Sequence, residues 1–165
     1  QHLTTLYTVV FSLGAQTVAE MGAGQSSYAL TAAVNATGGQ FYSIDVGAGG
    51  DLRLFPEGAG ILEKEPRYHF ILGDDMDVLK KWDKKLDVMF LDTSHRYLET
   101  KAELDGWTPW IRKGGILMMH DTATLDIVSK GCRQALDEFL AEHTGYSAMH
   151  IPNQEGLSIV RKDVV

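Results

Sequence analysis

Gly22 and Gly24 follow the first segment that reads as a buried strand, within residues 18–24 (VAEMGAG). Both glycines stand where we expect a strand to end and a helix to begin, so backbone amides can approach a ligand at the electropositive helix N-terminus. Asp45 comes 21 residues after Gly24, at the end of the next expected strand, where a carboxylate can accept both hydrogen bonds of a ribose diol. The pattern favours a nucleoside-containing ligand, and a tight turn with a helix cap is the structural alternative.

His95 is a candidate general base. It lies three residues beyond Asp92, just after another apolar run. An imidazole titrates near neutral pH, and one that faces a cleft can take the proton of a substrate hydroxyl. The structural alternative is a residue beside a helix N-cap, or a partner that orients another side chain of the site.

Short apolar runs alternate with amphipathic segments along the chain, which is typical of an α/β fold. The runs predict strands over residues 17–21, 40–45, 68–72, 86–91, 116–119, 147–151 and 157–160. The amphipathic segments predict helices over residues 3–13, 25–35, 76–82, 97–107 and from Val128 towards Gly145. We expect residues 46–60 to be mostly loop, residues 113–115 to form a turn, and residues 152–156 to close a hairpin.

These elements predict a Rossmann-like three-layer sandwich. Its sheet has seven strands, is mostly parallel, and carries an antiparallel strand in the C-terminal hairpin. The carboxyl ends of parallel strands meet at one edge of such a sheet, and ligands bind outside that edge. The glycine turn, Asp45 and Asp92 all follow strands, so we expect them to surround one cleft.

Composition limits the classes of protein and partner. A chain of 165 residues that is 44% hydrophobic suits a single domain over residues 1–165. Its net charge of −7 argues against binding to nucleic acid or to an anionic membrane, so small molecules are the expected partners. The single cysteine excludes an internal disulfide, and the chain reads as cytoplasmic. Its oligomeric state is open, and a homo-oligomer is compatible with the sequence.

Four motifs in order along the chain resemble the motif series of class I S-adenosylmethionine methyltransferases. They are E-x-G-x-G in residues 20–24, Asp45 after the second strand, Gly73-Asp74 after the third strand and Asp92 after the fourth. The terminal hairpin resembles that family's antiparallel seventh strand. The resemblance implies that S-adenosylmethionine is the cofactor.

The resemblance also implies roles for individual residues. Gly22 and Gly24 would pass under the methionine part of the cofactor, and Glu20 would support the turn or the cofactor's amino group. Asp45 would hold the ribose, and Asp74 would meet the adenine amine. These roles suit the chemistry, because a carboxylate accepts hydrogen bonds from a diol or an exocyclic amine. Ser26 departs from the pattern, since many members carry another glycine there.

The second half of the chain narrows the group. It is similar to small-molecule methyltransferases grouped with macrocin O-methyltransferase and the cephalosporin-biosynthesis hydroxylase relatives. The similarity is carried by residues 90–97 (FLDTSHRY), Glu103-Leu104, Trp107, Pro109, Gly114-Gly115 and residues 120–122 (HDT).

That group implies a divalent cation held by acidic residues after the fourth and fifth strands, here Asp92 and Asp121. Oxygen ligands suit Mg²⁺, and a hydroxyl bound to Mg²⁺ becomes more acidic. The hydroxylase relatives have an acidic residue at His120, and catechol-type enzymes have Asn at Thr122. Magnesium is therefore the expected ion. We expect His120 as the third ligand, and a nitrogen ligand would shift the preference towards manganese, iron or zinc. Alternatively, Asp92 caps the following helix and Asp121 caps a turn through Thr122.

The sequence therefore predicts methyl transfer from S-adenosylmethionine to the hydroxyl of a small-molecule acceptor, with Asp92 and His95 as catalytic residues. Two other classes of protein remain as alternatives. An NAD-type oxidoreductase would use the same glycine turn and Asp45, but the third glycine of its fingerprint is replaced by Ser27. A cofactor-binding domain without catalytic activity would keep the same pocket.

Overall fold

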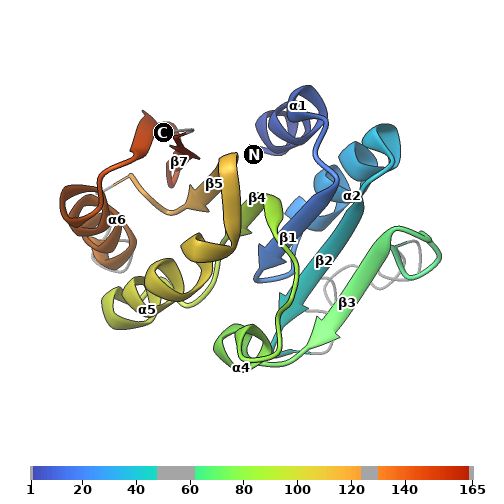
Figure 1. Ribbon diagram of the computed structural model, residues 1–165, viewed down its shortest axis with the longest axis horizontal. Coiled ribbons are helices and arrows are strands. Elements are labelled where there is room, and N and C mark those ends of the chain that lie inside the picture. Colours follow the sequence, from blue (N-terminus) through green and yellow to red (C-terminus); the bar gives the residue numbers. More distant parts are fainter. Residues whose placement is uncertain (1, 48–61, 124–129, 164–165) are drawn as a thin grey trace.

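Figure 1 shows the computed structural model, which describes residues 2–47, 62–123 and 130–163. The predicted seven-stranded sheet is confirmed. Its strands are β1 (Thr17–Met21), β2 (Gln40–Asp45), β3 (Tyr68–Leu72), β4 (Leu86–Leu91), β5 (Ile111–His120), β6 (Tyr146–Ile151) and β7 (Leu157–Lys162). The strand order is β3-β2-β1-β4-β5-β7-β6. The pairs from β3 to β5 are parallel, whereas β7 pairs antiparallel with both β5 and β6.

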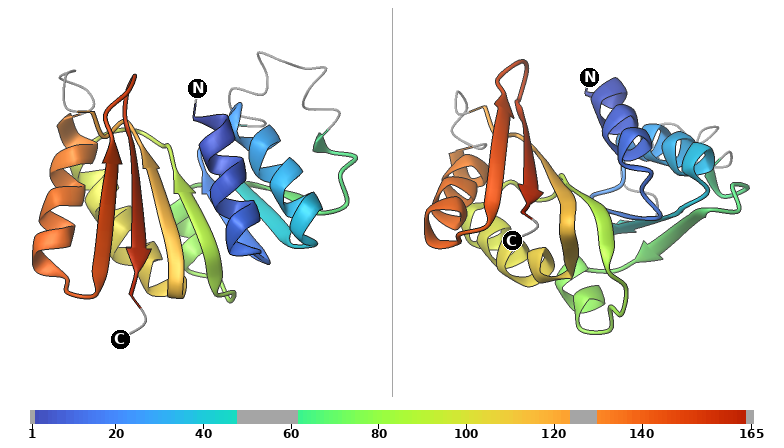
Figure 2. Two further views of the ribbon diagram at one scale, coloured as in Figure 1. Left: turned by 90° about the horizontal axis from the view of Figure 1, so that it is seen from above. Right: turned by 45° about the horizontal axis from the view of Figure 1, so that its top comes forward.

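Helices cover both faces of the sheet. They are α1 (Leu3–Leu13), α2 (Ser26–Thr37), α4 (Asp75–Leu79), α5 (Tyr97–Trp107) and α6 (Lys130–Glu142), with a 3₁₀ turn η2 (Thr108–Trp110). Figure 2 shows α1 and α2 side by side on one face, and α5 and α6 together on the other. The predicted three layers are confirmed.

Alternation along the central strands explains why both faces are covered. Successive residues of a strand point to opposite faces, and both sets are apolar here. In β4, Val88 and Phe90 join the core beneath α1 and α2, whereas Met89 and Leu91 join the core beneath α5 and α6. This pattern, a continuous apolar run, is what a strand buried on both faces requires.

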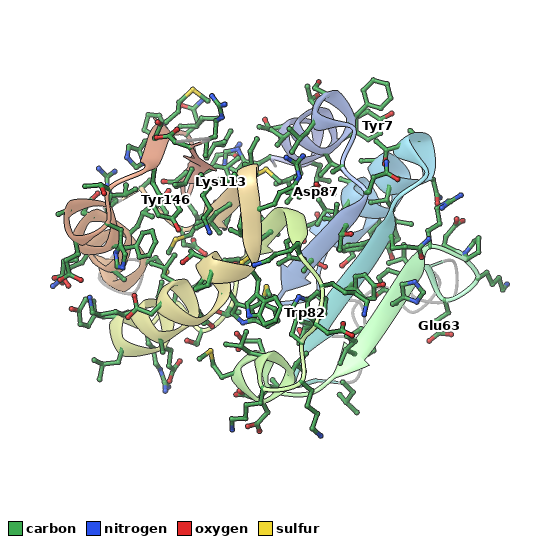
Figure 3. All side chains as sticks on the ribbon, viewed as in Figure 1. Tyr7, Glu63, Trp82, Asp87, Lys113 and Tyr146 are labelled. Atoms are coloured by element: carbon green, nitrogen blue, oxygen red, sulfur yellow. The ribbon has the colours of Figure 1, made fainter. Side chains whose placement is uncertain are left out.

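Asp87 ties the amino ends of three central strands together. One of its carboxylate oxygens accepts hydrogen bonds from the backbone amides of Gln16 (2.7 Å) and Thr17 (2.8 Å), and the other accepts one from the Arg112 guanidinium. Figure 3 labels Asp87 among the side chains of this region. β1, β4 and β5 are thereby fixed at the ends opposite to those that carry the expected site.

Two predicted boundaries are wrong. The predicted turn at residues 113–115 lies inside β5, which begins at Ile111 and continues past an irregularity in its pairing with β4. Gly114 adopts φ +77°, so the strand passes through this irregularity without ending. The helix predicted to reach Trp82 ends at Leu79, and the indole N–H of Trp82 instead donates to the carbonyl of Lys84 (2.6 Å).

Parts of the sequence predictions cannot be compared with this structure. The predicted loop over residues 46–60 lies outside the described residues from residue 48 onward, and so does Val128 at the predicted start of the last helix. Within residues 2–47, 62–123 and 130–163, no helix is both long enough and apolar enough to cross a membrane.

The packing of α6 reaches the segment that carries His95. Gly131 lies so close to this segment that a Cβ built on it would be 2.6 Å from the backbone nitrogen of Tyr97 and 2.9 Å from the carbonyl oxygen of His95. Both contacts are with backbone atoms, which cannot rotate away. A glycine at position 131 therefore allows α6 and residues 95–97 to pack as they do.

We predict that Gly131→Ala destabilises the protein by about 1–3 kcal/mol, the usual cost of forcing a methyl group into a packed interior. Urea denaturation measures the change. Gln134→Ala is the control, because Gln134 is exposed on the same helix and its side chain donates to Glu138. That variant should stay within about 0.5 kcal/mol of the wild type, and equal stability of the two variants would contradict the packing argument.

Candidate active site

A cleft of about 1320 Å³ opens at the carboxyl edge of the parallel strands. Its walls come from the ends of β1, β2, β3, β4 and β5 and from α1, α4 and α5. Of the residues predicted for the site, those that line it are Gly22, Gly24, Asp45, Asp74, Asp92, His95 and His120. Drug-sized ligands occupy roughly 300–1,000 Å³, so the cleft has room for a nucleoside cofactor and a second small molecule.

Gly22 holds the turn after β1 against the turn after β4. Its φ is +91°, and a Cβ at this position would lie 1.9 Å from the carbonyl oxygen of Asp92. The amide of Asp92 in turn donates to the carbonyl of Met21 (2.9 Å). Gly24 differs, because its φ lies outside the left-handed region and the atom nearest to a Cβ there is Ser26 Oγ at 4.0 Å.

Glu20 lies fully buried behind the glycine turn. Its carboxylate accepts hydrogen bonds from the hydroxyls of Ser26, Ser27 (2.6 Å) and Ser43 (2.8 Å). The Ser27 hydroxyl also accepts the amide N–H of Gly24 (3.3 Å), which links Glu20 to the turn. Of the two roles predicted for Glu20, these contacts favour support of the turn.

The same contacts account for the serines that depart from known fingerprints. Ser26 stands where many methyltransferases carry a glycine, and Ser27 stands at the third glycine of the dinucleotide-binding fingerprint. The hydroxyl of each serine donates a hydrogen bond to Glu20. The sequence analysis did not predict that these serines bind Glu20. The available signal was an acidic residue within an apolar strand, followed by two serines at the start of the next helix. Burial raises the pKa of Glu20 to about 7, although the three hydroxyls favour its ionised form.

Asp45 and Asp74 reach the cleft but also bond to the backbone. Asp45 accepts the amides of Ala23 (2.9 Å) and Gly47 (2.6 Å), one on each oxygen. Asp74 caps α4, and its Oδ1 accepts the amides of Met76 (3.0 Å) and Asp77 (3.2 Å). An ionised carboxylate has about four acceptor positions, so the carboxylate of Asp45 keeps capacity for a diol and that of Asp74 keeps capacity for an amine.

Glu103 and Asp75 also line the cleft, and the sequence analysis gave neither a site role. The Thr93 hydroxyl donates to one oxygen of Glu103 (2.7 Å), and the other oxygen is buried without a partner among the described residues. The Trp107 indole donates to Asp75 (2.9 Å). Burial raises the pKa of Glu103 to about 7 and also raises the pKa of Asp75.

Asp92, His95 and Asp121 form a compact cluster beside the glycine turn. His95 Nε2 lies 3.1 Å from Asp92 Oδ1 and 2.8 Å from Asp121 Oδ2. One ligand atom from each of the three residues lies within 4.8 Å of the others, a spacing that one cation could bridge. The predicted convergence of the two aspartates is therefore found, with His95 between them.

His120, the third ligand predicted from the sequence, adjoins this cluster. Its Nδ1 lies 3.2 Å from Asp121 Oδ2 and 3.7 Å from Asp92 Oδ1. Pairing of β4 with β5 aligns Leu91 with Met119, so the next residue of each strand, Asp92 and His120, lies at the same level of the sheet edge. The register of two parallel strands thus places the cluster.

Charges in the cluster determine its protonation. Hydrogen bonds to Asp121 and Asp92 raise the pKa of His95 to about 10, and the bond to Asp121 raises the pKa of His120. Burial opposes ionisation of Asp121, but the two histidines still hold its pKa well below the usual value. In this arrangement His95 is protonated at neutral pH, and a protonated imidazole cannot accept a proton from a substrate.

The capping alternative does not account for Asp92. The N-cap residue of α5 is Arg96, whose side chain makes no capping hydrogen bond, and the carboxylate of Asp92 faces His95. Thr122, which replaces an expected Asn ligand, is buried, and its hydroxyl accepts a hydrogen bond from Ser158 (2.8 Å). Asp121 faces His95 and His120.

Fold and cleft together define a class I, Rossmann-like methyltransferase, with a 3-2-1-4-5-7-6 sheet and a glycine turn after β1. A sequence comparison agrees: residues 19–122 match a family described as a methyltransferase domain, and the chain belongs to that family. The prediction of a methyltransferase enzyme is confirmed, and the oxidoreductase alternative is not supported.

Solved structures share the fold. An O-methyltransferase from Bacillus cereus, in complex with SAH, is similar with a TM-score of 0.79 at 16% identity, over 96% of this chain and 79% of that one. An SAH-bound methyltransferase from Podospora anserina has a TM-score of 0.76 at 18% identity, over 98% and 78%. TomG, an O-methyltransferase from Streptomyces achromogenes in complex with SAM, has a TM-score of 0.74 at 19% identity, over 98% and 79%.

The two glycines of the turn should respond differently to substitution. Gly22→Ala should cost about 2–4 kcal/mol of stability, because it combines an unfavourable φ with a clash against the Asp92 carbonyl. Gly24→Ala should cost less than about 1 kcal/mol, because its methyl group meets open space. Chemical denaturation of both variants checks this, and a larger loss for Gly24→Ala would refute the assignment.

The buried carboxyl of Glu20 should make stability depend on pH. Its pKa is higher in the folded than in the unfolded protein, so the folded state retains a proton that the unfolded state has lost. Its contribution is fully present below about pH 4.5 and is lost as pH rises through about 7, for a total of roughly 2–4 kcal/mol. Glu20→Gln, which stays neutral, should therefore gain stability relative to the wild type between pH 5 and pH 7.5.

Urea denaturation of both proteins across this range measures the effect. The comparison between the two proteins cancels the contribution of Glu103, whose pKa is raised in the same direction. A difference between the curves that is constant with pH would show that Glu20 is not the titrating group.

Proposed function

We propose that this protein transfers a methyl group from S-adenosylmethionine to the hydroxyl of a small-molecule acceptor, with a divalent cation at Asp92 and Asp121. The observation that carries the proposal is the contact of the glycine turn with Asp92, which lines the cleft and shares His95 with Asp121. In the reaction, an acceptor oxygen forms a bond to the methyl carbon while the sulfur–methyl bond breaks. The products are a methyl ether, S-adenosylhomocysteine and a proton.

Cleft residues support the cofactor part of the proposal. Gly22 and Gly24 bring backbone close to the ligand, and Asp45 stands at the end of β2 with acceptor capacity for a ribose diol. Asp74, at the start of α4, remains the candidate partner of the adenine amine. Three structural neighbours are bound to SAM or SAH, which agrees with these assignments.

The arrangement of ligand atoms in the cluster supports the proposal of a divalent cation. Ligand atoms of Asp92, His95 and Asp121 lie within 4.8 Å of one another and would hold the ion, and His120 adjoins the two carboxylates. When bound, such an ion makes a coordinated hydroxyl more acidic and orients it. Asp92 is fixed at its backbone by the bond to Met21 and by contact with Gly22, so an acceptor held there would lie beside the cofactor turn. Alignment of donor and acceptor supplies much of the rate in such reactions.

The role of general base that the sequence predicts for His95 remains a proposal, and it requires that His95 first lose its own proton. His95 could accept a substrate proton only after positive charge at the two carboxylates has displaced its own proton. A cytoplasmic location and a small-molecule acceptor also remain proposals, as does self-association. A cofactor-binding domain without turnover is the remaining alternative, and the assay below separates it from an enzyme.

Turnover should depend on a cation and on the two aspartates. We expect S-adenosylhomocysteine to form when the protein is given S-adenosylmethionine and hydroxylated acceptors, to stop with a chelator, and to resume when metal is added. Asp121→Asn should lower turnover by at least about 10- to 100-fold. Asp45→Ala should instead weaken cofactor binding by about 1.5–3 kcal/mol in calorimetry.

Asp137→Asn is the matched control, because Asp137 pairs with Arg133 on the exposed side of α6. This variant should behave as the wild type. Normal metal-free turnover by folded Asp92→Asn and Asp121→Asn proteins would eliminate the cation. Cofactor binding without turnover on any acceptor would favour the domain that only binds.

A further inference from the structure

We propose that the cation site selects a first-row transition-metal ion over Mg²⁺, through a ligand set of two imidazoles and two carboxylates. The ligands are His95, His120, Asp92 and Asp121. This inference rests on the cation in the proposed function. It assigns to His95 the role of a ligand in place of a base.

The position of His95 Nε2 is the first argument. This nitrogen lies 3.1 Å from Asp92 Oδ1 and 2.8 Å from Asp121 Oδ2, and so between the two oxygens that would hold the ion. An ion bound by both oxygens would have the same nitrogen beside it. A general base would need this nitrogen to face the acceptor, whereas here it faces the carboxylates.

A second imidazole approaches the two carboxylates from the next strand. His120 Nδ1 approaches both of the same oxygens, at 3.2 Å from Asp121 Oδ2 and 3.7 Å from Asp92 Oδ1. The His120 side chain is largely buried, and its ring packs edge-on against His2 at 5.5 Å. These contacts hold the His120 ring beside the cluster in the absence of a metal ion.

Neighbouring hydroxyls that could have supplied oxygen ligands are bonded elsewhere. Thr93, next to Asp92, donates to Glu103 (2.7 Å), and Thr122, next to Asp121, is bonded to Ser158 (2.8 Å). Ser158 also contacts His150 Nδ1 (2.7 Å), so Thr122 belongs to a chain that leads away from the site. The donors that converge on the cluster are therefore two nitrogens and two oxygens.

This donor set decides between metals. Mg²⁺ strongly prefers oxygen ligands and retains much of its water, whereas imidazole suits iron, nickel, copper and zinc. The affinity of a given site for divalent first-row ions rises from manganese through cobalt to copper. A mixed set of this kind should therefore bind Mn²⁺ or Co²⁺ clearly more tightly than Mg²⁺.

Calorimetry with Mn²⁺ and Mg²⁺ separately, on metal-stripped protein, tests the selection. We expect Mn²⁺ to bind at least about 100-fold more tightly than Mg²⁺ in the wild type. His95→Gly should weaken Mn²⁺ binding by about 10- to 100-fold, with little effect on Mg²⁺. Glycine is the chosen replacement because His95 has φ +60°, which glycine adopts without strain. Equal affinities for the two ions, or no binding of either, would overturn the inference.

Pulsed electron paramagnetic resonance of bound Mn²⁺ reports the ligands directly. Coordinated imidazole nitrogen should modulate the signal of the wild type, and the modulation should decrease in His95→Gly and in His120→Ala. His69→Ala is the control, because His69 lies on β3 at the far edge of the sheet and bonds to Gln40. Bound Mn²⁺ without nitrogen modulation would overturn the inference.

Different results would overturn the metal selection and the proposed methyltransferase function. Mg²⁺ binding equal to Mn²⁺ binding, together with Mg²⁺-dependent turnover, would remove the metal selection and leave the methyltransferase proposal intact. Tight Mn²⁺ binding with nitrogen modulation, in a protein that binds no S-adenosylmethionine, would do the reverse.

Discussion

Two carboxylates at the ends of adjacent parallel strands need positive charge between them, and the site is arranged around this requirement. Asp92 follows β4 and Asp121 follows β5, so strand pairing alone brings them together. Two ionised carboxylates at this separation would repel one another strongly in a partly buried place. Without a metal, the charge is supplied by a proton on His95, which both carboxylates bind. A metal ion would replace that proton.

Negative charge extends beyond this pair along the whole cleft. Its lining includes the acidic residues Asp45, Asp74, Asp75, Asp92, Glu99 and Glu103, within a chain whose net charge is −7. Among the described residues of this lining, acidic residues outnumber the histidines, which are His2, His95 and His120, and a cleft in which negative charge predominates concentrates cationic ligands. S-adenosylmethionine carries a positive sulfonium, which its product lacks, so the acidic lining favours the donor over the product and agrees with the proposed reaction.

The sequence predicted those features that depend on local pattern. Short apolar-rich runs that end at Gly or Asp predicted β1, β2, β3 and β4 with the observed bounds. β4 is buried on both faces, as a continuous apolar run requires, whereas β3, at the edge of the sheet, is only partly buried. The start of β5 was missed because Lys113-Gly114-Gly115 has the composition of a turn, whereas a single positive φ at Gly114 lets the strand continue.

Contacts within the site were harder to predict than its members. Order along the chain was enough to select seven of the residues that line the cleft, since strand ends collect at one edge, but not Asp75 or Glu103. The place of His95 between the aspartates depends on its φ of +60° and on the close packing of Gly131, and spacing reveals neither. The hydroxyls around Glu20 come from two different elements, α2 and β2, so their convergence required the folded chain.

The backbones of Gly22 and Asp92 are in direct contact, because the α-carbon of Gly22 packs against the carbonyl of Asp92. The amide of Asp92 also donates a hydrogen bond to the carbonyl of Met21. Neither turn can move without displacing its neighbour. A cofactor at the glycine turn and a cation at Asp92, as proposed above, would therefore be linked thermodynamically, and linkage acts equally in both directions. A ligand that orders one turn lowers the entropy that the other ligand must still remove, so donor and ion would bind as a cooperative pair and the loss of one would loosen the other.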